Sequence, residues 1–328
     1  MNSVVQAGVR AIVAALPDGA ELDGATVVIT GAGGFLGAWI ALVALESGAH
    51  VTGLVRDEKR ARNRLGSHPA LELVVGDAAD PPELAGDYFV HAASPATPRA
   101  YGVDPVGTIA PNTIGTHALL RMARDTRSRG LLFVSSGEIY GQVEEIPTPE
   151  TAYGAVDPTD VRSVYAEGKR AGETLCVAWH VQYGVPAVIA RPFHTYGPMM
   201  ALDDGRVHAD FIAALAEGRD LQMRSDGRAF RAFCYVADVV AGLFTVLLRG
   251  EPGTAYNVGS DEQISVGELA ALLAQEFGVS VVRAPVRSGY LESPISRNCP
   301  NIERIARLGW RPTTTLIDGF RLAVESYR

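Results

Sequence analysis

Cysteine is scarce in this chain of 328 residues, and the positions of the cysteines argue against a zinc-stabilised or disulfide-stabilised fold. Cys176, Cys234 and Cys299 lie far apart and form neither a zinc motif nor a disulfide framework. We therefore expect buried free thiols and a location in a reducing cytoplasm. The seven histidines are scattered without metal-ligand spacing, so no metal site is predicted.

Blocks of positive charge and long apolar runs are also missing. The 29 Lys and Arg residues are outnumbered by 37 Asp and Glu residues, and the formal charge of -8 argues against a nucleic-acid partner. The apolar stretch at 3–16 is broken by Gln6 and Arg10 and is too short to span a bilayer. It reads as an amphipathic helix, so neither a signal peptide nor a membrane partner is expected.

Short β-branched runs alternate with helical periodicity through the first 190 residues. Strands are predicted at 25–30, 50–55, 71–75, 88–91, 130–135 and 185–190, and helices at 35–46, 104–124 and 161–183. This order predicts an α/β fold, a Rossmann-type doubly wound parallel sheet that binds ligands at the carboxyl ends of its strands. A smaller mixed α/β substrate-binding domain is expected beside it.

The length of the chain favours two domains. The regular alternation weakens after Pro192, where a helix near 207–216 and short strands around Leu221 and Ala232 are expected, and 236–259 resembles a return to the large sheet. We predict a helical extension at 1–24, a large domain of 25–192 plus about 234–259, and a substrate domain of about 193–233 plus 260–328.

A glycine-rich turn, Gly31-Ala32-Gly33-Gly34-Phe35-Leu36-Gly37, follows the first predicted strand. The first glycine permits the turn, the second lets the backbone approach a pyrophosphate, and the third allows close helix packing. The pattern alone also fits an ordinary strand-to-helix turn. Its place at the start of a βαβ unit favours a dinucleotide site formed by residues 31–37.

The next strand ends supply further candidates for the cofactor site. An NAD site usually has an acidic residue about 20 residues after the turn, whereas arginine there accommodates a 2′-phosphate. Here Arg56 precedes Asp57, so NAD is predicted with NADP left open. Asp77 would meet the adenine or would only stabilise its own turn, and Ala92-Ala93-Ser94 would pass the nicotinamide ribose.

Tyr165 and Lys169 are four residues apart on a predicted helix, so their side chains share one face. The ammonium is expected to stabilise a phenolate and to lower the tyrosine pKa from about 10 toward neutrality. Such a base beside a nicotinamide can oxidise an alcohol, and Ser136 at a strand end would hold the same hydroxyl. Alone, the pair fits a solvated helix surface; its order with Ser136 and the glycine turn favours catalysis.

With these motifs the chain resembles the extended short-chain dehydrogenases/reductases, the group of nucleotide-sugar epimerases, dehydratases and decarboxylases. Within the group it most resembles the UDP-glucuronate decarboxylases, through 91–96, 112–116, 165–170, 204–207 and 231–233. Those enzymes typically carry Thr-Ser-Glu where this chain has Ser136-Gly137-Glu138. The glutamate is kept and the two residues before it differ.

The resemblance implies a nucleotide-sugar decarboxylase that uses NAD. NAD+ would accept hydride from C4 of UDP-glucuronate as Tyr165 takes the hydroxyl proton, and the resulting ketone would let the C6 carboxylate leave as carbon dioxide. Glu138 would orient substrate or a proton-bearing water, and Arg231 would assist protonation at C5. Hydride return gives UDP-xylose. Because Ser136 and Gly137 depart from the pattern, we expect some UDP-4-keto-xylose to escape first.

The resemblance also implies the remaining contacts and a homodimer built from helices 104–124 and 161–183. Asn112 is expected in the cofactor site. The candidate substrate-binding residues are Pro95, Ser136, Glu138, His194, Thr195, Arg206, Val207 and Arg231, with Tyr290 and Arg297 as weaker candidates. His194 stands where relatives usually have asparagine, which leaves the nucleotide open.

Three alternatives remain. A hexose 4,6-dehydratase would place an aspartate at the position of Gly137 to protonate the leaving hydroxyl. A 4-epimerase would need only that the keto sugar rotate before hydride returns. A non-catalytic nucleotide-binding sensor is expected to have lost the base, whereas Tyr165 is present.

Overall fold

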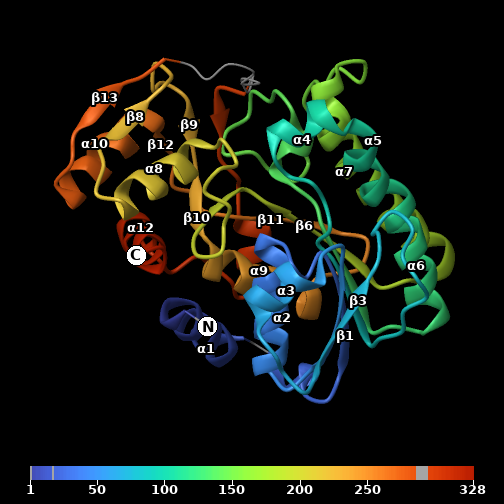
Figure 1. The fold of residues 1–328 in the computed structure, drawn as a ribbon. Helices are drawn as coiled ribbons and strands as arrows, with labels where there is room; N and C mark the ends of the chain where they lie inside the picture. Colours follow the sequence, from blue (N-terminus) through green and yellow to red (C-terminus); the bar gives the residue numbers. More distant parts are fainter. Residues whose placement is uncertain (1, 17, 286–294) are drawn as a thin grey trace.

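The computed structural model describes residues 2–16, 18–285 and 295–328. Its centre is a seven-stranded sheet in the order β11-β6-β5-β4-β1-β2-β3, in which every pairing is parallel (Figure 1). The strands are β1 (Thr26–Thr30), β2 (His50–Val55), β3 (Leu71–Val75), β4 (Tyr88–His91), β5 (Gly130–Val134), β6 (Ala187–Pro192) and β11 (Ala255–Val258). The predicted Rossmann-type sheet is confirmed.

Helices cover both faces of this sheet. Along β1, Val27 and Ile29 join the core under α2 (Phe35–Glu46) and α9 (Val236–Arg249). Val28 points to the opposite core, under α6 (Thr116–Asp125) and α7 (Val164–Tyr183). Because successive strand residues face opposite ways and both faces are buried, the strands read as continuous apolar runs.

The predicted helix at 104–124 is divided. It consists of α5 (Pro105–Ala110), a π-helical turn, η2 (Pro111–Gly115), and α6. Pro111 has no N–H to donate, so the α-helical ladder changes there. The helix predicted at 161–183 begins as a 3₁₀ turn, η4 (Val161–Ser163), and becomes α-helical at Val164.

The rest of the chain builds smaller units. The further strands are β7 (His194–Tyr196) paired with β10 (Phe233–Tyr235), β8 (Leu221–Met223) with β13 (Val281–Arg283), and β9 (Phe230–Arg231) between β12 (Ile264–Ser265) and β14 (Arg297–Asn298). The further helices are α3 (Glu58–Leu65), α4 (Pro98–Val103), α8 (Val207–Ala216), α10 (Val266–Phe277), α11 (Glu303–Ala306) and α12 (Leu316–Ser326), with 3₁₀ turns η1 (Gly19–Leu22) and η3 (Gly137–Tyr140). The return of β11 to the main sheet is observed; the division into domains stays a prediction.

The amino-terminal stretch forms α1 (Ser3–Ala15), as predicted. Asn2 accepts a hydrogen bond from the Val4 N–H and so caps the helix. Val5, Val9 and Ile12 are buried where α1 packs against α2, α9 and α12 (Figure 1). This helix therefore bridges an early helix of the main sheet and the carboxyl-terminal helix.

The three cysteines are free and buried, as expected. None of the helices in the described ranges is long and apolar enough to cross a membrane. Within the same ranges no group of three or more His, Cys, Asp or Glu side chains could hold a metal ion. The cytoplasmic location stays a prediction.

Candidate active site

The glycine turn at the start of α2 has the backbone geometry that a pyrophosphate requires. Gly31 has φ +72°, and the Gly34 N–H donates to its carbonyl at 2.7 Å. A Cβ on Gly37 would lie 2.1 Å from the Gly31 carbonyl oxygen, so no side chain fits there. The backbone N–H groups at the amino terminus of α2 are therefore accessible to a bound phosphate.

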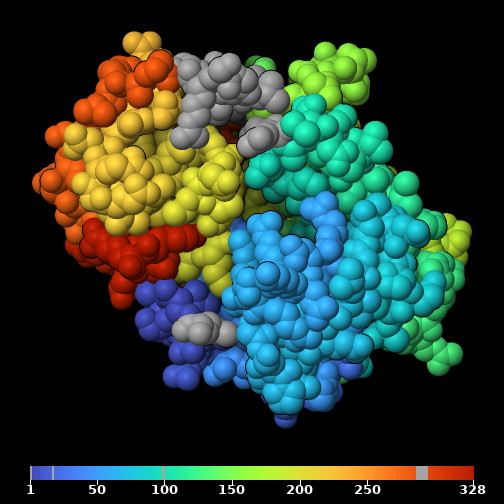
Figure 2. Space-filling view, in the orientation of Figure 1, coloured from blue at the N-terminus to red at the C-terminus, as the bar shows by residue number. Residues whose placement is uncertain are grey.

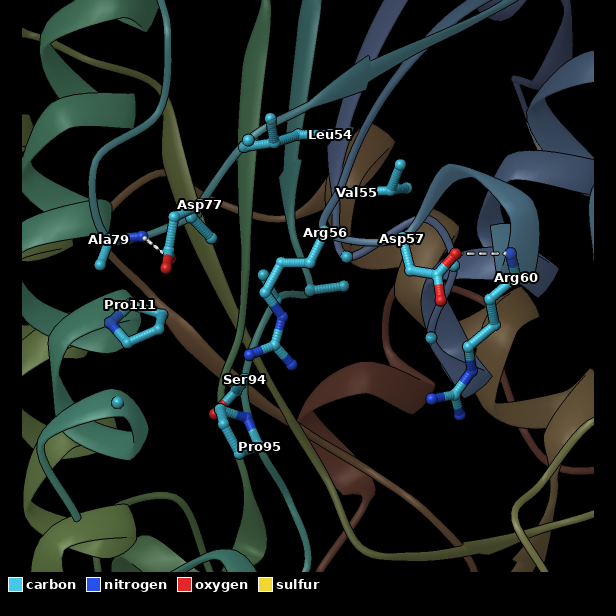
Figure 3. Close-up of a pocket in the computed structure, with 18 of the residues that line it drawn as sticks. Leu54, Val55, Arg56, Asp57, Arg60, Asp77, Ala79, Ser94, Pro95 and Pro111 are labelled. Carbon is cyan, nitrogen blue, oxygen red and sulfur yellow. Dashed lines mark hydrogen bonds between the residues drawn. The ribbon is translucent and has the colours of Figure 1, made fainter. Parts of the chain in front are cut away.

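A cavity of about 340 Å³ lies beyond the carboxyl ends of β1, β2, β3 and β4 (Figure 3). Its lining includes Gly31, Gly33, Gly34, Arg56, Asp57, Arg60, Asp77, Ala92, Ala93, Ser94 and Pro95. The strand order reverses between β1 and β4, which is where such sheets bind dinucleotides. Six predicted cofactor residues lie outside this lining: Phe35, Leu36, Gly37, Asn112, Tyr165 and Lys169.

The two acidic candidates also stabilise their own turns. Asp57 accepts from the Arg60 N–H at 2.9 Å and caps α3, and Asp77 accepts from the Ala79 N–H at 2.9 Å (Figure 3). Figure 3 also shows Arg56 extending into the pocket between these two acids. The structure thus supports the turn role of Asp77, and its contact with adenine stays a prediction.

A buried chain of hydrogen bonds, here called the Thr30–His91 relay, fixes the loop after β4. The sequence did not reveal it. The Ala93 N–H donates to the Thr30 hydroxyl at 3.2 Å, so that hydroxyl can donate to His91 Nδ1, 2.7 Å away. His91 Nε2 then donates to the Pro111 carbonyl at 2.8 Å. Burial and the nearby Lys169 lower the His91 pKa to about 3, so the ring is a neutral connector between the sheet and η2.

Asn112, on η2, holds the same loop. Its amide donates to the Ser94 hydroxyl at 3.0 Å and to the Thr108 carbonyl at 2.8 Å. Its Oδ1 is buried and has no hydrogen-bond partner among the described residues. Asn112 therefore positions Ser94 at the cavity wall and keeps one free acceptor.

Tyr165 and Ser136 meet as expected. Tyr165 is buried on α7, and the Ser136 side chain lies near enough to its hydroxyl to act on the Tyr165 pKa. The ring of Tyr101, from α4, stacks on Tyr165 with centroids 5.1 Å apart and planes at 12°. Tyr101 was not predicted, because nothing in its local sequence indicates that α4 folds over the catalytic helix.

The expected lowering of the Tyr165 pKa is wrong for this arrangement. Burial raises the Tyr165 pKa to about 12, while the Ser136 hydrogen bond and Arg206 act in the opposite direction. The Lys169 ammonium donates to the Val134 carbonyl at 2.6 Å and lies 5.8 Å from the Tyr165 ring centroid. Burial lowers the pKa of Lys169 itself to about 7. Desolvation is therefore the dominant cause of the pKa shift of each of the two groups.

Glu138 faces three guanidinium groups. Burial raises the pKa of its carboxyl group, and Arg162, Arg206 and Arg231 act to lower it. Arg206 and Arg231 were predicted at the site; Arg162, three residues before Tyr165, was missed. Arg162 Nη1 is buried without a hydrogen-bond partner in the described ranges, so a donor is left for an anion.

The arginines differ in how they are held. Arg206 pairs with Asp204, its Nε lying 2.8 Å from Oδ2. Arg231 donates to the carbonyls of Phe230 at 2.7 Å and Ile295 at 2.8 Å. The exposed Arg297 lies over the Phe230 ring and donates to Gln263 Oε1. Tyr290 lies outside the described residues.

The remaining substrate candidates lie on β7 and at the start of α8. His194 and Thr195 belong to β7, and Val207 is the first residue of α8. His194 Nε2 is buried without a hydrogen-bond partner in the part of the chain described here. Burial, Arg231 and His208 keep the His194 pKa well below its usual value, so the ring is neutral. In Figure 2 the surface is hollowed between the yellow segment that carries these elements and the blue-to-teal part.

Residues 27–259 match the NAD dependent epimerase/dehydratase family, and the chain belongs to that family. Its cofactor is NAD, in agreement with the glycine turn and the cavity. Among curated proteins, the chain is 35% identical over 308 residues to UDP-glucuronic acid decarboxylase 5 of Arabidopsis thaliana, covering 92% of this chain and 89% of that protein. It is 34% identical to UDP-glucuronic acid decarboxylase 1 of Xenopus tropicalis, covering 94% and 73%.

Solved structures show the same fold. A UDP-glucuronic acid 4-epimerase from Bacillus cereus, in complex with UDP-glucuronic acid and NAD, superposes with a TM-score of 0.80 at 22% identity, covering 92% of this chain and 98% of that one. A dTDP-glucose 4,6-dehydratase from Streptomyces venezuelae superposes with a TM-score of 0.77 at 25% identity, covering 92% and 96%.

Proposed function

We propose that the protein is a UDP-glucuronate decarboxylase, which oxidises C4 of UDP-glucuronic acid and releases carbon dioxide. The observation that carries the proposal is the meeting of Tyr165, Ser136 and Glu138 beside three guanidinium groups, in a chain 35% identical to decarboxylases over most of its length. The products are UDP-4-keto-xylose and, after reduction, UDP-xylose.

The residues of the chain move the protons. Bound NAD supplies the hydride acceptor and later the hydride donor. Tyr165 takes the proton of the C4 hydroxyl, which Ser136 orients by hydrogen bonding. The positive charges of Lys169 and of an oxidised nicotinamide oppose the burial that raises the Tyr165 pKa to about 12.

Decarboxylation follows from the ketone at C4. The bond between C5 and the carboxyl carbon breaks, its electron pair forms an enolate with O4, and carbon dioxide leaves. Donors aimed at that oxygen each contribute about 3 kcal/mol to such a step. Glu138, whose raised pKa lets it hold a proton, and Arg231 assist protonation at C5.

The nucleotide diphosphate is held by two of the arginines that face Glu138. Arg206 and Arg231 offer guanidinium donors to phosphate oxygens, and the neutral His194 offers a ring nitrogen in the place of an amide. Thr195, Val207 and Pro95 border the same hollow in this proposal. The identity of the base is left to measurement.

Incubation of the purified protein with UDP-glucuronate tests the proposal. Release of carbon dioxide is the expected result. An isomerised uronate without gas indicates a 4-epimerase, and absence of turnover with retained NAD indicates a sensor. A 4,6-dehydratase is disfavoured because Gly137 has no acid to protonate a leaving hydroxyl.

We also propose a homodimer formed through the stretch that contains α5, η2 and α6 and through α7. Several apolar side chains on this surface are exposed: Val106 by 73%, Ile114 by 64% and Val181 by 79%. Apolar side chains this exposed would leave water if a partner covered them. A second copy of the chain would cover this surface in a four-helix packing.

A further inference from the structure

A buried ionic cluster lies behind the reacting face of α7, and the mechanism above does not use it. Glu173 and Arg191 are 8% and 6% exposed. Arg191 donates from Nε to Glu173 Oε1 at 2.9 Å and from Nη2 to Oε2 at 2.6 Å, and the Ser135 hydroxyl donates to Oε1 at 2.5 Å. The two guanidinium bonds from Arg191 keep the buried carboxylate ionised, and the neutral Ser135 hydroxyl adds one further donor.

The cluster is fixed from several elements. The remaining nitrogen of Arg191, Nη1, donates to the Tyr140 hydroxyl at 2.8 Å and to the Glu150 carbonyl at 2.9 Å. Ser135 follows β5, Arg191 is on β6, and Tyr140 ends η3. Glu173 therefore cannot swing away from its place on α7.

Lys169 needs a negative neighbour. It is 2% exposed, and burial of an ammonium favours its neutral form. Glu173 is one helical turn further along the same face, and it is the main group opposing the fall of the Lys169 pKa to about 7. The other titratable groups around Lys169 are His91 on β4 and Tyr165 and Cys176 on α7. Burial keeps all three uncharged, since it lowers the pKa of His91 and raises those of Tyr165 and Cys176.

We propose that Glu173 is a positioning residue of the reaction: held by Arg191, its carboxylate raises the fraction of Lys169 that carries the ammonium charge, and this charge supports the Tyr165 phenolate. The inference rests on the proposed function in one respect: in that function the Lys169 charge supports the Tyr165 phenolate. A neutral amine in the same place would leave the phenolate without its cation.

The chain offers an unusually clean test, because it contains only two lysines, Lys59 and Lys169. Lys59 is exposed on α3 and provides a reference in the same spectrum. Full-length protein labelled with carbon-13 at lysine Cε is titrated by NMR, without substrate. In Glu173→Gln we expect the Lys169 pKa to fall by about one unit below that of the wild type. Ser135→Ala, which removes a neutral donor and keeps the carboxylate, is the matched control and should leave the Lys169 pKa near the wild-type value.

An unchanged Lys169 pKa in Glu173→Gln, or an equal fall in Ser135→Ala, overturns the proposal. Should Glu173→Gln fail to fold, Glu173→Asp is measured instead. It moves the carboxylate away by one methylene group and should lower the Lys169 pKa by a smaller amount. An unchanged Lys169 pKa in Glu173→Asp also overturns the proposal. In the decarboxylation assay the high-pH limb of kcat/KM should move down with the Lys169 pKa. If the Lys169 pKa falls in Glu173→Gln but the wild type releases no carbon dioxide, the proposed function is wrong and the effect of Glu173 on Lys169 is still established.

Discussion

At the residue scale, Tyr165 is the side chain on which the proposed chemistry depends. Tyr165→Phe should lower carbon dioxide release from UDP-glucuronate by at least about a thousandfold, because the variant lacks the hydroxyl that takes the C4 proton in the proposed mechanism. NAD binding, measured by fluorescence titration, should persist because the glycine turn is untouched. Tyr153→Phe is the control, since that ring is 86% exposed. Comparable loss in both variants would contradict the assignment.

Lys169 makes stability depend on pH. Its folded pKa is about 7 against 10.5 for a lysine side chain free in water, so between these values the unfolded chain binds a proton that the folded chain does not. The free energy of unfolding of the wild type should therefore increase as pH rises between these two pKa values. Below pH 7 the full cost of burying the Lys169 ammonium is present. Lys169→Met removes the buried ammonium and leaves Glu173 paired with Arg191.

We expect Lys169→Met to be more stable than the wild type by about 2 kcal/mol near pH 6.5 and inactive in decarboxylation. The gain should shrink toward pH 10. Urea unfolding at several pH values measures it. A variant that is less stable than the wild type at pH 6.5 would show that burial of this ammonium has no net cost.

The product ratio should respond to Ser136. Ser136→Thr adds the methyl group that relatives carry and restricts the rotation of the hydroxyl that orients C4. The fraction of UDP-4-keto-xylose released in a single turnover should fall. Product analysis showing only UDP-xylose from the wild type would end this hypothesis. Gly137 is a poorer test position, because a Cβ there would lie 3.0 Å from the Phe193 ring.

The sequence predicted which residues meet at the site where those residues follow neighbouring strands of the main sheet. Ser136 lies two residues after β5, and Tyr165 lies in the first turn of α7, which packs on that strand, so their meeting follows from element order. The pKa of Tyr165 could not be predicted, because Tyr101 and Phe133, from distant segments, bury it and Lys169. Glu173 had a signal in its four-residue spacing from Lys169, but Arg191, its partner, is revealed only by the pairing of β5 with β6.

At the element scale, strands and long helices agreed with their periodicity, and differences arose where one residue changes the hydrogen bonding. Pro111 converts part of a predicted helix into η2, and the relay from Thr30 through His91 ends on its carbonyl. Neither feature has a periodic signature. The short strand β9 was placed only approximately, around Ala232, and β14 was not predicted, because two-residue pairings carry little sequence signal.

Helix α1 contributes to stability through its buried side. Ile12 is 4% exposed, so Ile12→Ala should lower the free energy of unfolding by about 2 to 4 kcal/mol. Arg10→Ala, on the exposed side of the same helix, should change it by less than about 0.5 kcal/mol. Equilibrium unfolding in urea compares the two. Equal effects would mean that α1 does not pack as described.

At the scale of the whole molecule, the dimer proposal can be tested by charge. Val106→Asp combined with Val181→Asp should convert dimer to monomer, because two carboxylates would be buried at the interface. Val75→Asp is the control: Val75 is 60% exposed and lies on β3, an edge strand of the sheet. Light scattering after size exclusion measures the mass. A monomeric wild type would contradict the proposal.

The path of the chain through the main sheet also bears on its synthesis. Strands β1 to β6, which frame the cofactor crevice, are complete by residue 192, yet the helix that covers β5 and β6 on one face is α9, at 236–249. The strand that closes the β6 edge, β11, comes later still. A nascent chain emerging from the ribosome therefore carries an uncovered apolar sheet face for about 50 residues of elongation, which is the interval in which chaperone capture or aggregation competes with folding.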